Sequence, residues 1–399
     1  MVPKWAGYVA LSTGVLLLAA CGSSAGNENS ASGKTKTITI GDINSLSGTA
    51  AAAGIGLANS EDVAADRINA AGGFKIGDTT YKLKVKRYDD AGTAEGGVAA
   101  MTKMVQQDGI HFMVGTVASS AAGGMLPVIQ RHNDDLAVIW TGASAAEDVG
   151  PTNAFRMAIS SPNVVKAHAD YAKTQGWTSA VDVVDSTNPG QVAATGSFKK
   201  DLESNGIKLV GSTSITRGQT DFTSLITKMR PLNPSFVELR LYPDDEVTLI
   251  KQARETGWNV PFLVVSNLVP DSVASLPPNQ VTQIHQAGWA TIQDLVSANI
   301  SGAQQLFDDY KAKWKDDPGF LTMNGVEGIN AMVAAMKQAQ SVDPKDVVKA
   351  LADLKPYEGM IWPLKPIDGN VFGPDRETGV PIAVSVWENG KLTFKKILQ

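Results

Sequence analysis

The sequence predicts an α/β fold with two doubly wound domains, each built around a parallel sheet, and three observations support this prediction. From Thr37 onward, short β-rich runs alternate with helical patterns, and two such series follow one another along the chain. The length of 399 residues suffices for two or three domains, and 43% hydrophobic against 19% charged residues is typical of well-packed globular proteins. After about Ile284 the chain offers mainly helices, so we expect these helices to cover an earlier sheet.

The first series predicts one domain of βαβ type. The run from Thr37 to Ile43 is rich in β-branched residues, and the helix that follows ends at Gly72-Gly73. Strands are expected at Thr37–Ile43, Tyr81–Tyr88, His111–Val114 and Ala137–Trp140, and helices at Leu57–Ala71, Glu95–Gln107 and Ser120–Gln130.

The second series repeats the same alternation and predicts a second domain. Strands are expected at Ala180–Val184, Lys208–Ser212, Phe236–Leu241 and Phe262–Val265, and helices at Val164–Gln175, Gln191–Asn205, Phe222–Met229 and Glu246–Thr256. Further helices are expected at Ala303–Lys315, Gly325–Gln340 and Pro344–Leu354. The chain then ends in a hairpin whose turn is Asn389-Gly390.

The first 36 residues predict export and lipid anchoring. Lys4 precedes an apolar run, Ala6–Ala20, which has the length of a signal peptide and is short for a membrane-spanning helix. The run ends in Leu-Ala-Ala-Cys, which resembles the lipobox of bacterial lipoproteins, so Cys21 is the expected lipidation site. Residues 1–20 are thus expected to be a signal peptide and residues 21–36 a lipidated cysteine with a flexible polar tether. The alternative is a buried cysteine in an ordinary signal anchor.

Composition argues against several other classes of protein. Lys+Arg 35 against Asp+Glu 40 gives a net charge of -5, and no basic cluster suited to a phosphate backbone occurs, so we expect no nucleic-acid partner. Four histidines stand far apart and Cys21 is the single cysteine, so neither a zinc site nor a disulfide framework is expected. We therefore expect no metal and no cofactor.

The expected binding loops lie at the carboxyl ends of the strands, where parallel α/β domains carry their sites. These loops are residues 44–54, 116–120, 141–145, 185–190, 242–245 and 266–269, and they are rich in Ser, Thr, Gly and Asn. In several of them a helix begins at once, so free N–H groups can hold a carboxylate or carbonyl oxygen.

Short motifs that imitate enzyme sites lack their required context, so we expect no catalysis. Gly54-Ile55-Gly56 does not directly follow a strand and has Asn59 where a dinucleotide-binding loop needs glycine. Ser197 and Lys200 have the spacing of an acyl-enzyme motif but lie within an expected solvated helix. Asp89-Asp90 is an adjacent pair for which turn and capping roles are the expected ones.

Several segments together resemble the leucine/isoleucine/valine-binding protein family. They are Asp66–Gly73 (Asp-Arg-Ile-Asn-Ala-Ala-Gly-Gly), Tyr88–Ala91 (Tyr-Asp-Asp-Ala), Gly115–Ser120 (Gly-Thr-Val-Ala-Ser-Ser) and Asp221–Leu225 (Asp-Phe-Thr-Ser-Leu). The resemblance covers nearly the whole chain after the tether. It implies a type I periplasmic binding protein of an ABC importer, with two α/β domains that close over a ligand by hinge motion.

The resemblance also implies domain boundaries. Three crossovers join the domains, and they are expected near Met157, His285 and Asp375. Domain I would then comprise residues 37–157 and 286–375, and domain II residues 158–285 and 376–399.

Binding residues carry over from the family position by position. Ser119, with Ser120 beside it, matches the serine loop that receives the ligand carboxylate in amino-acid binders. Ala143, Ser144 and Ala145 match a second carboxylate loop, where the hydroxyl is displaced to Ser144 and only backbone N–H contacts are implied. Tyr242 matches the family's tyrosine after a domain II strand, and a packing aromatic is the alternative.

Three positions depart from the amino-acid binders. Ala53 stands where an aromatic side chain often covers the ligand, and Pro189 stands where tyrosine is common. Ser266-Asn267 stands where amino-acid binders place the acid that pairs with the ligand ammonium, although Asp244 or Asp245 could substitute.

Arg240 is the remaining candidate for the site. Its guanidinium suits a ligand carboxylate if the side chain faces the cleft. A structural ion pair with Glu238, two residues earlier on the same strand face, is the alternative.

Together these features predict an extracytoplasmic solute-binding lipoprotein on the outer face of the cytoplasmic membrane. It would capture a small carboxylate or amide, rather than a branched-chain amino acid, and deliver it to an ABC permease as a monomer held to the membrane only by lipid. The alternative is a ligand-sensing subunit for a membrane signalling protein, because the two roles share one fold.

Overall fold

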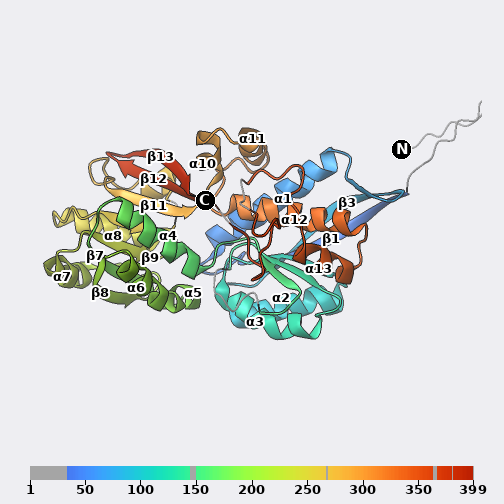
Figure 1. The fold of residues 1–399 in the computed structure, drawn as a ribbon, viewed down its shortest axis with the longest axis horizontal. Coiled ribbons are helices and arrows are strands. Elements are labelled where there is room, and N and C mark those ends of the chain that lie inside the picture. The colour runs from blue at the N-terminus through green and yellow to red at the C-terminus, as the bar shows by residue number, and fades with distance from the viewer. Residues whose placement is uncertain (1–33, 144–149, 267, 363–365, 380, 399) are drawn as a thin grey trace, which may run out of the picture. The chain divides into compact units, whose positions relative to one another are not determined.

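The computed structural model describes residues 34–143, 150–266, 268–362, 366–379 and 381–398. These residues form two α/β lobes, each with its own sheet (Figure 1). The expected signal peptide and the lipidated Cys21 lie outside the described residues. Among the described helices, none is long and apolar enough to cross a membrane.

The first lobe contains a six-stranded sheet in the order β2-β3-β1-β4-β5-β6. Its strands are β1 (Lys34–Asn44), β2 (Phe74–Ile76), β3 (Thr79–Asp89), β4 (Phe112–Gly115), β5 (Ala137–Trp140) and β6 (Ala154–Arg156). All neighbouring strands are parallel except β2 and β3. The sheet is thus mixed but mostly parallel, and its parallel strands end at one edge.

The second lobe contains a seven-stranded sheet in the order β13-β12-β11-β10-β9-β7-β8. Its strands are β7 (Ser179–Asp185), β8 (Lys208–Ile215), β9 (Phe236–Arg240), β10 (Phe262–Val264), β11 (Ile284–Trp289), β12 (Ile382–Glu388) and β13 (Lys391–Leu398). Its strand pairs are parallel except β11 with β12 and, at the edge of the sheet, β12 with β13. Strands β12 and β13 form the predicted hairpin, whose turn residues Asn389 and Gly390 have φ angles of 53° and 79°.

Helices follow most of the parallel strands, which confirms the predicted alternation. Their bounds are α1 (Ala51–Ala70), α2 (Ala94–Thr102), α3 (Ser119–Arg131), α4 (Ser161–Thr174), α5 (Pro189–Ala193), α6 (Thr195–Ser204), α7 (Thr223–Met229), α8 (Pro243–Glu255), α9 (Pro270–Val273), α10 (Ile292–Ser297), α11 (Ala303–Trp314), α12 (Thr322–Ala339) and α13 (Pro344–Ala352). A π-helical turn, Lys103–Gln107, continues α2.

Helix α12 covers the first sheet, as the scarcity of strands in the last third of the chain predicts. It packs against α1 and contacts β4 and β5. Glycines allow this close approach, because a Cβ on Gly325 would lie 2.1 Å from the hydroxyl oxygen of Ser60 and one on Gly328 would lie 2.5 Å from Cγ2 of Thr141. The late helices therefore complete the first lobe.

Two predicted boundaries are wrong. Strand β1 begins at Lys34, so the last three residues assigned to the tether belong to the first sheet. The second crossover follows β11 rather than lying near His285, because β11 pairs with β10 and β12 in the second sheet.

Strand β11 is not predicted from the sequence, because polar His285 and Gln286 interrupt its apolar residues. Both side chains find partners inside the fold. The Tyr171 hydroxyl lies 2.8 Å from Nδ1 of His285, and Nε1 of Trp387 donates to Oε1 of Gln286 at 2.8 Å. The polar residues of this strand are thus satisfied by tertiary contacts that a local pattern does not reveal.

The chain crosses between the lobes three times. The first crossing lies between β6 and α4, since α4 packs on α6 and β11 of the second lobe. The second follows Trp289, and the third lies between Thr378, whose N–H still donates to the Arg156 carbonyl, and the start of β12 at Ile382.

Candidate functional site

Two neighbouring cavities lie in the cleft between the lobes. The inner cavity, of about 50 Å³, is lined by Val117 and Gly142 of the first lobe and by strand-end residues of the second. The outer cavity, of about 230 Å³, is lined by Ala53 of α1 and residues around the start of α8. Tyr242, Pro243 and Phe320 line both cavities, so the two form one continuous candidate site.

The inner cavity has mainly apolar walls. Its lining residues are Val117, Gly142, Asn188, Gln191, Leu241, Tyr242, Pro243, Val265, Ser266, Trp289, Phe320 and Leu321. The ring of Trp289 stacks on that of Phe320, with centroids 5.6 Å apart. No residue in this set carries a charge, so the walls described by the structure suit an apolar body with a few polar ends.

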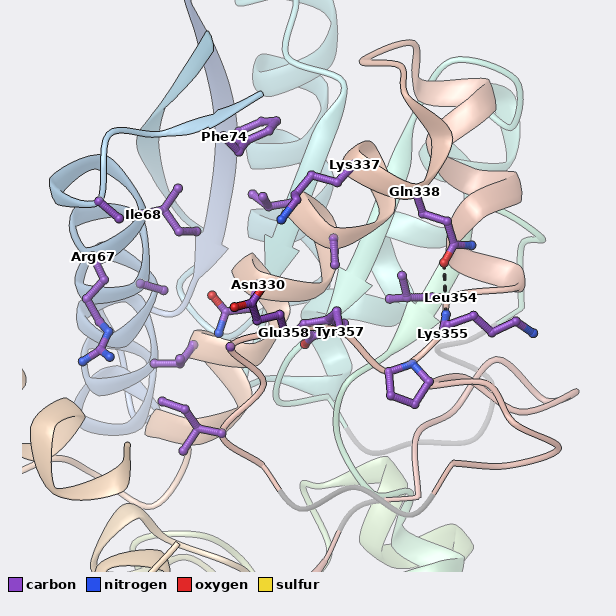
Figure 2. A pocket seen from close by; sticks show the side chains of 18 of the residues that line it. Arg67, Ile68, Phe74, Asn330, Lys337, Gln338, Leu354, Lys355, Tyr357 and Glu358 are labelled. Atoms are coloured by element: carbon purple, nitrogen blue, oxygen red, sulfur yellow. Dashed lines mark hydrogen bonds between the residues drawn. The ribbon is translucent and has the colours of Figure 1, made fainter. Parts of the chain in front are cut away.

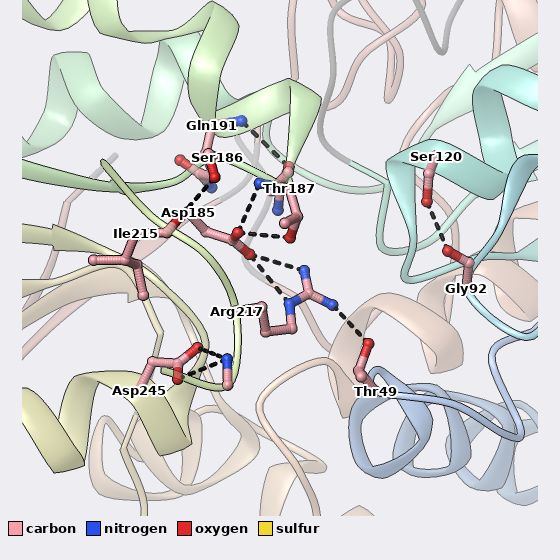
Figure 3. A network of polar contacts seen from close by, with 12 residues as sticks. Thr49, Gly92, Ser120, Asp185, Ser186, Thr187, Gln191, Ile215, Arg217 and Asp245 are labelled. Atoms are coloured by element: carbon pink, nitrogen blue, oxygen red, sulfur yellow. Dashed lines mark hydrogen bonds and ion pairs between the residues drawn. The ribbon is translucent and has the colours of Figure 1, made fainter. Parts of the chain in front are cut away.

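A charged network borders the cleft on the second lobe (Figure 3). Arg217 follows β8 and donates to Oδ2 of Asp185 from Nε at 3.1 Å and from Nη2 at 3.0 Å. Its Cζ lies 3.5 Å from the centroid of the Tyr242 ring. Its Nη1 also reaches the hydroxyl of Thr49, in the first lobe, at 3.4 Å. Arg217 thus links the two lobes beside the cavity that Tyr242 lines.

Asp90 organises the strand ends of the first lobe. Its carboxylate accepts hydrogen bonds from the hydroxyl of Ser45 at 2.7 Å, from the hydroxyl of Thr116, and from the Gly92 N–H at 2.8 Å. Asp89 beside it accepts from the N–H groups of Leu46, Ser47 and Ala91. The Asp89-Asp90 pair therefore has the predicted turn role and holds three loops together.

The structure places the predicted first-lobe residues at this edge. Ser119 and Ser120 are the first residues of α3, and the Ser120 hydroxyl donates to the Gly92 carbonyl at 2.8 Å. Ala143 is fully buried after β5, next to Gly142 of the inner cavity. Ser144 and Ala145 lie outside the described residues.

On the second lobe, two of the predicted residues line the cleft. Tyr242 lines both cavities, and Ser266 lines the inner one while its hydroxyl donates to the Glu246 carboxyl group. Pro189 begins α5 but is not a lining residue, whereas Asn188 and Gln191 on either side of it are. Asn267 lies outside the described residues.

Arg240 does not face the cleft. It forms a structural ion pair, which is the alternative prediction for this residue. It is fully buried and binds Asp182 with both ends of its guanidinium, from Nε at 3.0 Å and from Nη2 at 2.6 Å. Nη1 donates to the Gln191 carbonyl and Nη2 to the Thr195 hydroxyl at 2.8 Å. The partner is Asp182 rather than the expected Glu238, because Glu238 is 2.5 Å from Nδ1 of His168.

Most acidic side chains near the cleft already have protein partners. Asp185 binds Arg217, Asp245 accepts from the Gly218 N–H at 3.1 Å, and Glu246 accepts from Ser266. Burial raises the pKa of Glu246 well above its usual range, which favours the neutral acid. Among the described residues that line either cavity, the one acid is Asp244, which is exposed and lines the outer cavity.

Sequence reasoning missed Arg217, Gln191, Trp289 and Phe320. Arg217 lies two residues after the end of β8, which runs three residues beyond its predicted end, so this strand-end position is a usable signal. Gln191 follows the predicted loop 185–190. Phe320 reaches the cleft only through the packing of the segment before α12, for which the local pattern gives no indication.

A larger cavity, of about 400 Å³, lies in the first lobe between α1, α12 and residues 354–361 (Figure 2). Arg67, Lys337 and Tyr357 are among its lining residues. It shares no lining residue with the cleft cavities, so it is separate from the site predicted at the strand ends.

Comparisons with known proteins agree with this architecture. A family model described as periplasmic binding protein matches residues 37–391. The chain belongs to this family. Its members are solute-binding proteins of ABC transporters and are not enzymes, so the predicted fold and family are confirmed.

Individual relatives cover almost the same range. The chain is 27% identical over 366 residues to Leu/Ile/Val-binding protein homolog 3 of Brucella melitensis, covering 89% of this chain and 92% of that protein. Two solved structures share the fold. The Streptococcus pneumoniae binding protein LivJ in complex with isoleucine has a TM-score of 0.78 and 21% identity, covering 91% of this chain and 99% of that one. An R. palustris solute binding protein in complex with benzoate has a TM-score of 0.76 and 16% identity, covering 91% and 96%.

Proposed function

We propose that this protein captures a small carboxylate or amide in the cleft between its lobes and delivers it to an ABC permease. The observation that carries the proposal is the inner cavity, whose described lining residues are apolar, aromatic or neutral polar and include no acid. A buried ammonium group is costly unless an acid pairs with it. The lining therefore favours a ligand without an ammonium group over leucine, isoleucine or valine.

In this proposal the ligand carboxylate lies at the first lobe. Ser119 begins α3, a helix of 13 residues, whose first N–H groups and hydroxyl side chain favour an anionic oxygen. Ala143, with Ser144 and Ala145 after it, would add backbone donors. The body of the ligand would lie against Trp289, Phe320 and Tyr242, whose rings supply apolar contact.

Relatives with both kinds of ligand make the choice testable. One structural neighbour is in complex with isoleucine and another with benzoate. Because the identities are 21% and 16%, these neighbours show the fold alone, and the ligand must be decided by this chain's own residues.

A thermal-shift screen of the purified protein tests the proposal. We expect aromatic or aliphatic carboxylates, or amides, to raise Tm. A ligand that binds only the folded state, at a concentration 100 times its Kd, adds about 2.7 kcal/mol to the free energy of unfolding. Asp244→Asn serves as the matched variant, since Asp244 is the one described acid on the cavity walls. Leucine or valine binding that Asp244→Asn abolishes, with no response to acids, would contradict the proposed ligand class.

Delivery to a permease and lipid anchoring belong to the same proposal. The family consists of transporter subunits, and the sequence places a lipobox at Cys21 before a polar tether. Uptake of the identified ligand should fall when the gene for this protein is deleted from its host. Unchanged uptake, with loss of a transcriptional or behavioural response to the ligand, would favour the sensing alternative.

A further inference from the structure

Gln191 carries a buried polar atom that no protein group satisfies. The residue lies in α5 and lines the inner cavity, and only 6% of its surface is exposed. Its side-chain oxygen, Oε1, is buried and accepts no hydrogen bond from the described residues. An acceptor removed from water in this way is unfavourable unless a donor reaches it. A ligand bound in the adjacent cavity can supply this donor.

The backbone of Gln191 is fixed from two sides. Its N–H donates to the side chain of Asn188 at 3.3 Å, and its carbonyl accepts from Nη1 of Arg240. Arg240 is itself held by Asp182 and by the hydroxyl of Thr195. A buried ion pair therefore fixes the backbone from which the Gln191 side chain reaches the cavity wall.

Three other polar side chains of the inner cavity have contacts within the protein. Asn188 caps α5 through its oxygen, and the Ser266 hydroxyl donates to Glu246. Tyr242 lies under the guanidinium of Arg217. Among the described side chains that line the inner cavity, Gln191 is the one with a buried oxygen that has no hydrogen-bond partner.

We propose that Gln191 is a specificity-determining residue that reads a hydrogen-bond donor on the ligand. The ligand class is then a carboxylic acid that bears a hydroxyl group or an amide N–H at the end facing the second lobe. This inference rests on the proposed function, because it needs an acid bound in the cleft. A site built to bond such a group discriminates strongly against the analogue that lacks it.

Calorimetric titration of matched acids tests the inference. The probes are benzoate with its three monohydroxy derivatives, and butanoate with its three monohydroxy derivatives. We expect one hydroxylated acid to bind the wild-type protein about tenfold more tightly than its parent. Gln191→Leu should remove this preference by weakening the binding of the hydroxylated acid to about that of its parent.

Two controls separate recognition from folding. Gln175→Leu changes an exposed glutamine at the end of α4 and should keep the preference. Gln191→Met is the second apolar variant if Gln191→Leu does not fold. We expect the Tm of either variant without ligand to match or exceed that of wild type, because the substitution removes an unsatisfied buried acceptor.

The outcomes distinguish the two proposals. If an acid binds but hydroxylated and parent acids bind equally, or if Gln191→Leu keeps the preference, the inference about Gln191 is wrong and the proposed function stands. If leucine or valine binds and none of the acids does, both are wrong.

Discussion

Arg240 and Asp182 form a buried ion pair behind the cleft, and neither side chain is exposed. We expect Arg240→Met to lower the free energy of unfolding by about 3–5 kcal/mol, because it leaves the Asp182 carboxylate unpaired in the interior. Urea unfolding measures this loss. The double variant Arg240→Met/Asp182→Leu should recover most of it.

The matched control is Lys166→Met, which breaks an exposed pair with Asp170 on α4. Exposed pairs contribute less than about 1 kcal/mol, so this variant should remain close to wild type. Equal losses in the two single variants would contradict a structural role for Arg240.

Asp42 makes stability depend on pH. The residue is fully buried, it accepts a hydrogen bond from Asn44, and Arg87 lies 3.6 Å away. Burial raises the pKa of Asp42 to about 6 and that of neighbouring Glu61 well above its usual range, and Asp62 adds a further negative charge. Because the folded state holds these protons more tightly than the unfolded state, the free energy of unfolding contributed by Asp42 decreases as pH rises from about 4 to 6.

We therefore expect Asp42→Asn to gain stability relative to wild type across this pH window. Unfolding in urea at pH 4, 5, 6 and 7 measures the difference. Asp134→Asn, at an exposed position, is the control and should show no such trend. A difference between Asp42→Asn and wild type that is constant with pH would show that Asp42 does not titrate as described.

The sequence predicts a site residue correctly where the position of a single loop is enough to place it in the cleft. Tyr242, Ser266 and Ala53 line the cavities because each follows the end of a strand or begins a helix there. Phe320 and the partner of Arg240 could not be predicted, because both depend on which distant segments pack together. These positions are set by tertiary contacts and not by periodicity.

Helix α1 contains two glycines, Gly54 and Gly56, near the loop that follows β1. A Cβ on Gly54 would lie 2.1 Å from the Ser45 carbonyl oxygen, whereas a Cβ on Gly56 would meet nothing within 4 Å. Gly54, and not Gly56, thus allows α1 to pack closely on the loop after β1. This packing positions Thr49, which meets Arg217 across the cleft.

We expect Gly54→Ala to destabilise the protein by about 1–3 kcal/mol through overpacking. Gly56→Ala should instead stabilise it by about 0.5–1 kcal/mol, because alanine favours the helix. Thermal unfolding of both variants checks the prediction. Destabilisation by Gly56→Ala equal to that by Gly54→Ala would contradict the close-packing explanation.

The elements themselves follow from local pattern wherever a run is long or strongly periodic. Strands β1, β3, β4 and β5, strands β7 to β10 and the final hairpin are predicted. Strands β2 and β6, each of three residues, and β11 are not. Short strands carry too few residues for a period to show, and β11 interrupts its apolar residues with His285 and Gln286.

At the scale of the whole molecule, Cys21→Ala tests the lipid anchor. We expect the variant to be released or mislocalised while remaining folded, because stable anchoring needs two or more acyl chains and, in the proposed function, these are attached through the Cys21 thiol. Membrane fractionation with the unliganded Tm as a folding check is the measurement. A variant that stays on the membrane like wild type would show that Cys21 is not the anchor.

In the proposed function, the cleft binds a small acid and not a branched-chain amino acid. Calorimetric titration of the purified protein with the acid that raises Tm most, and with leucine, tests it most directly. We expect saturable one-to-one binding of the acid, weakened by roughly 1–3 kcal/mol in Ser119→Ala, and weak or no binding of leucine. Tight leucine binding without binding of any acid would contradict it.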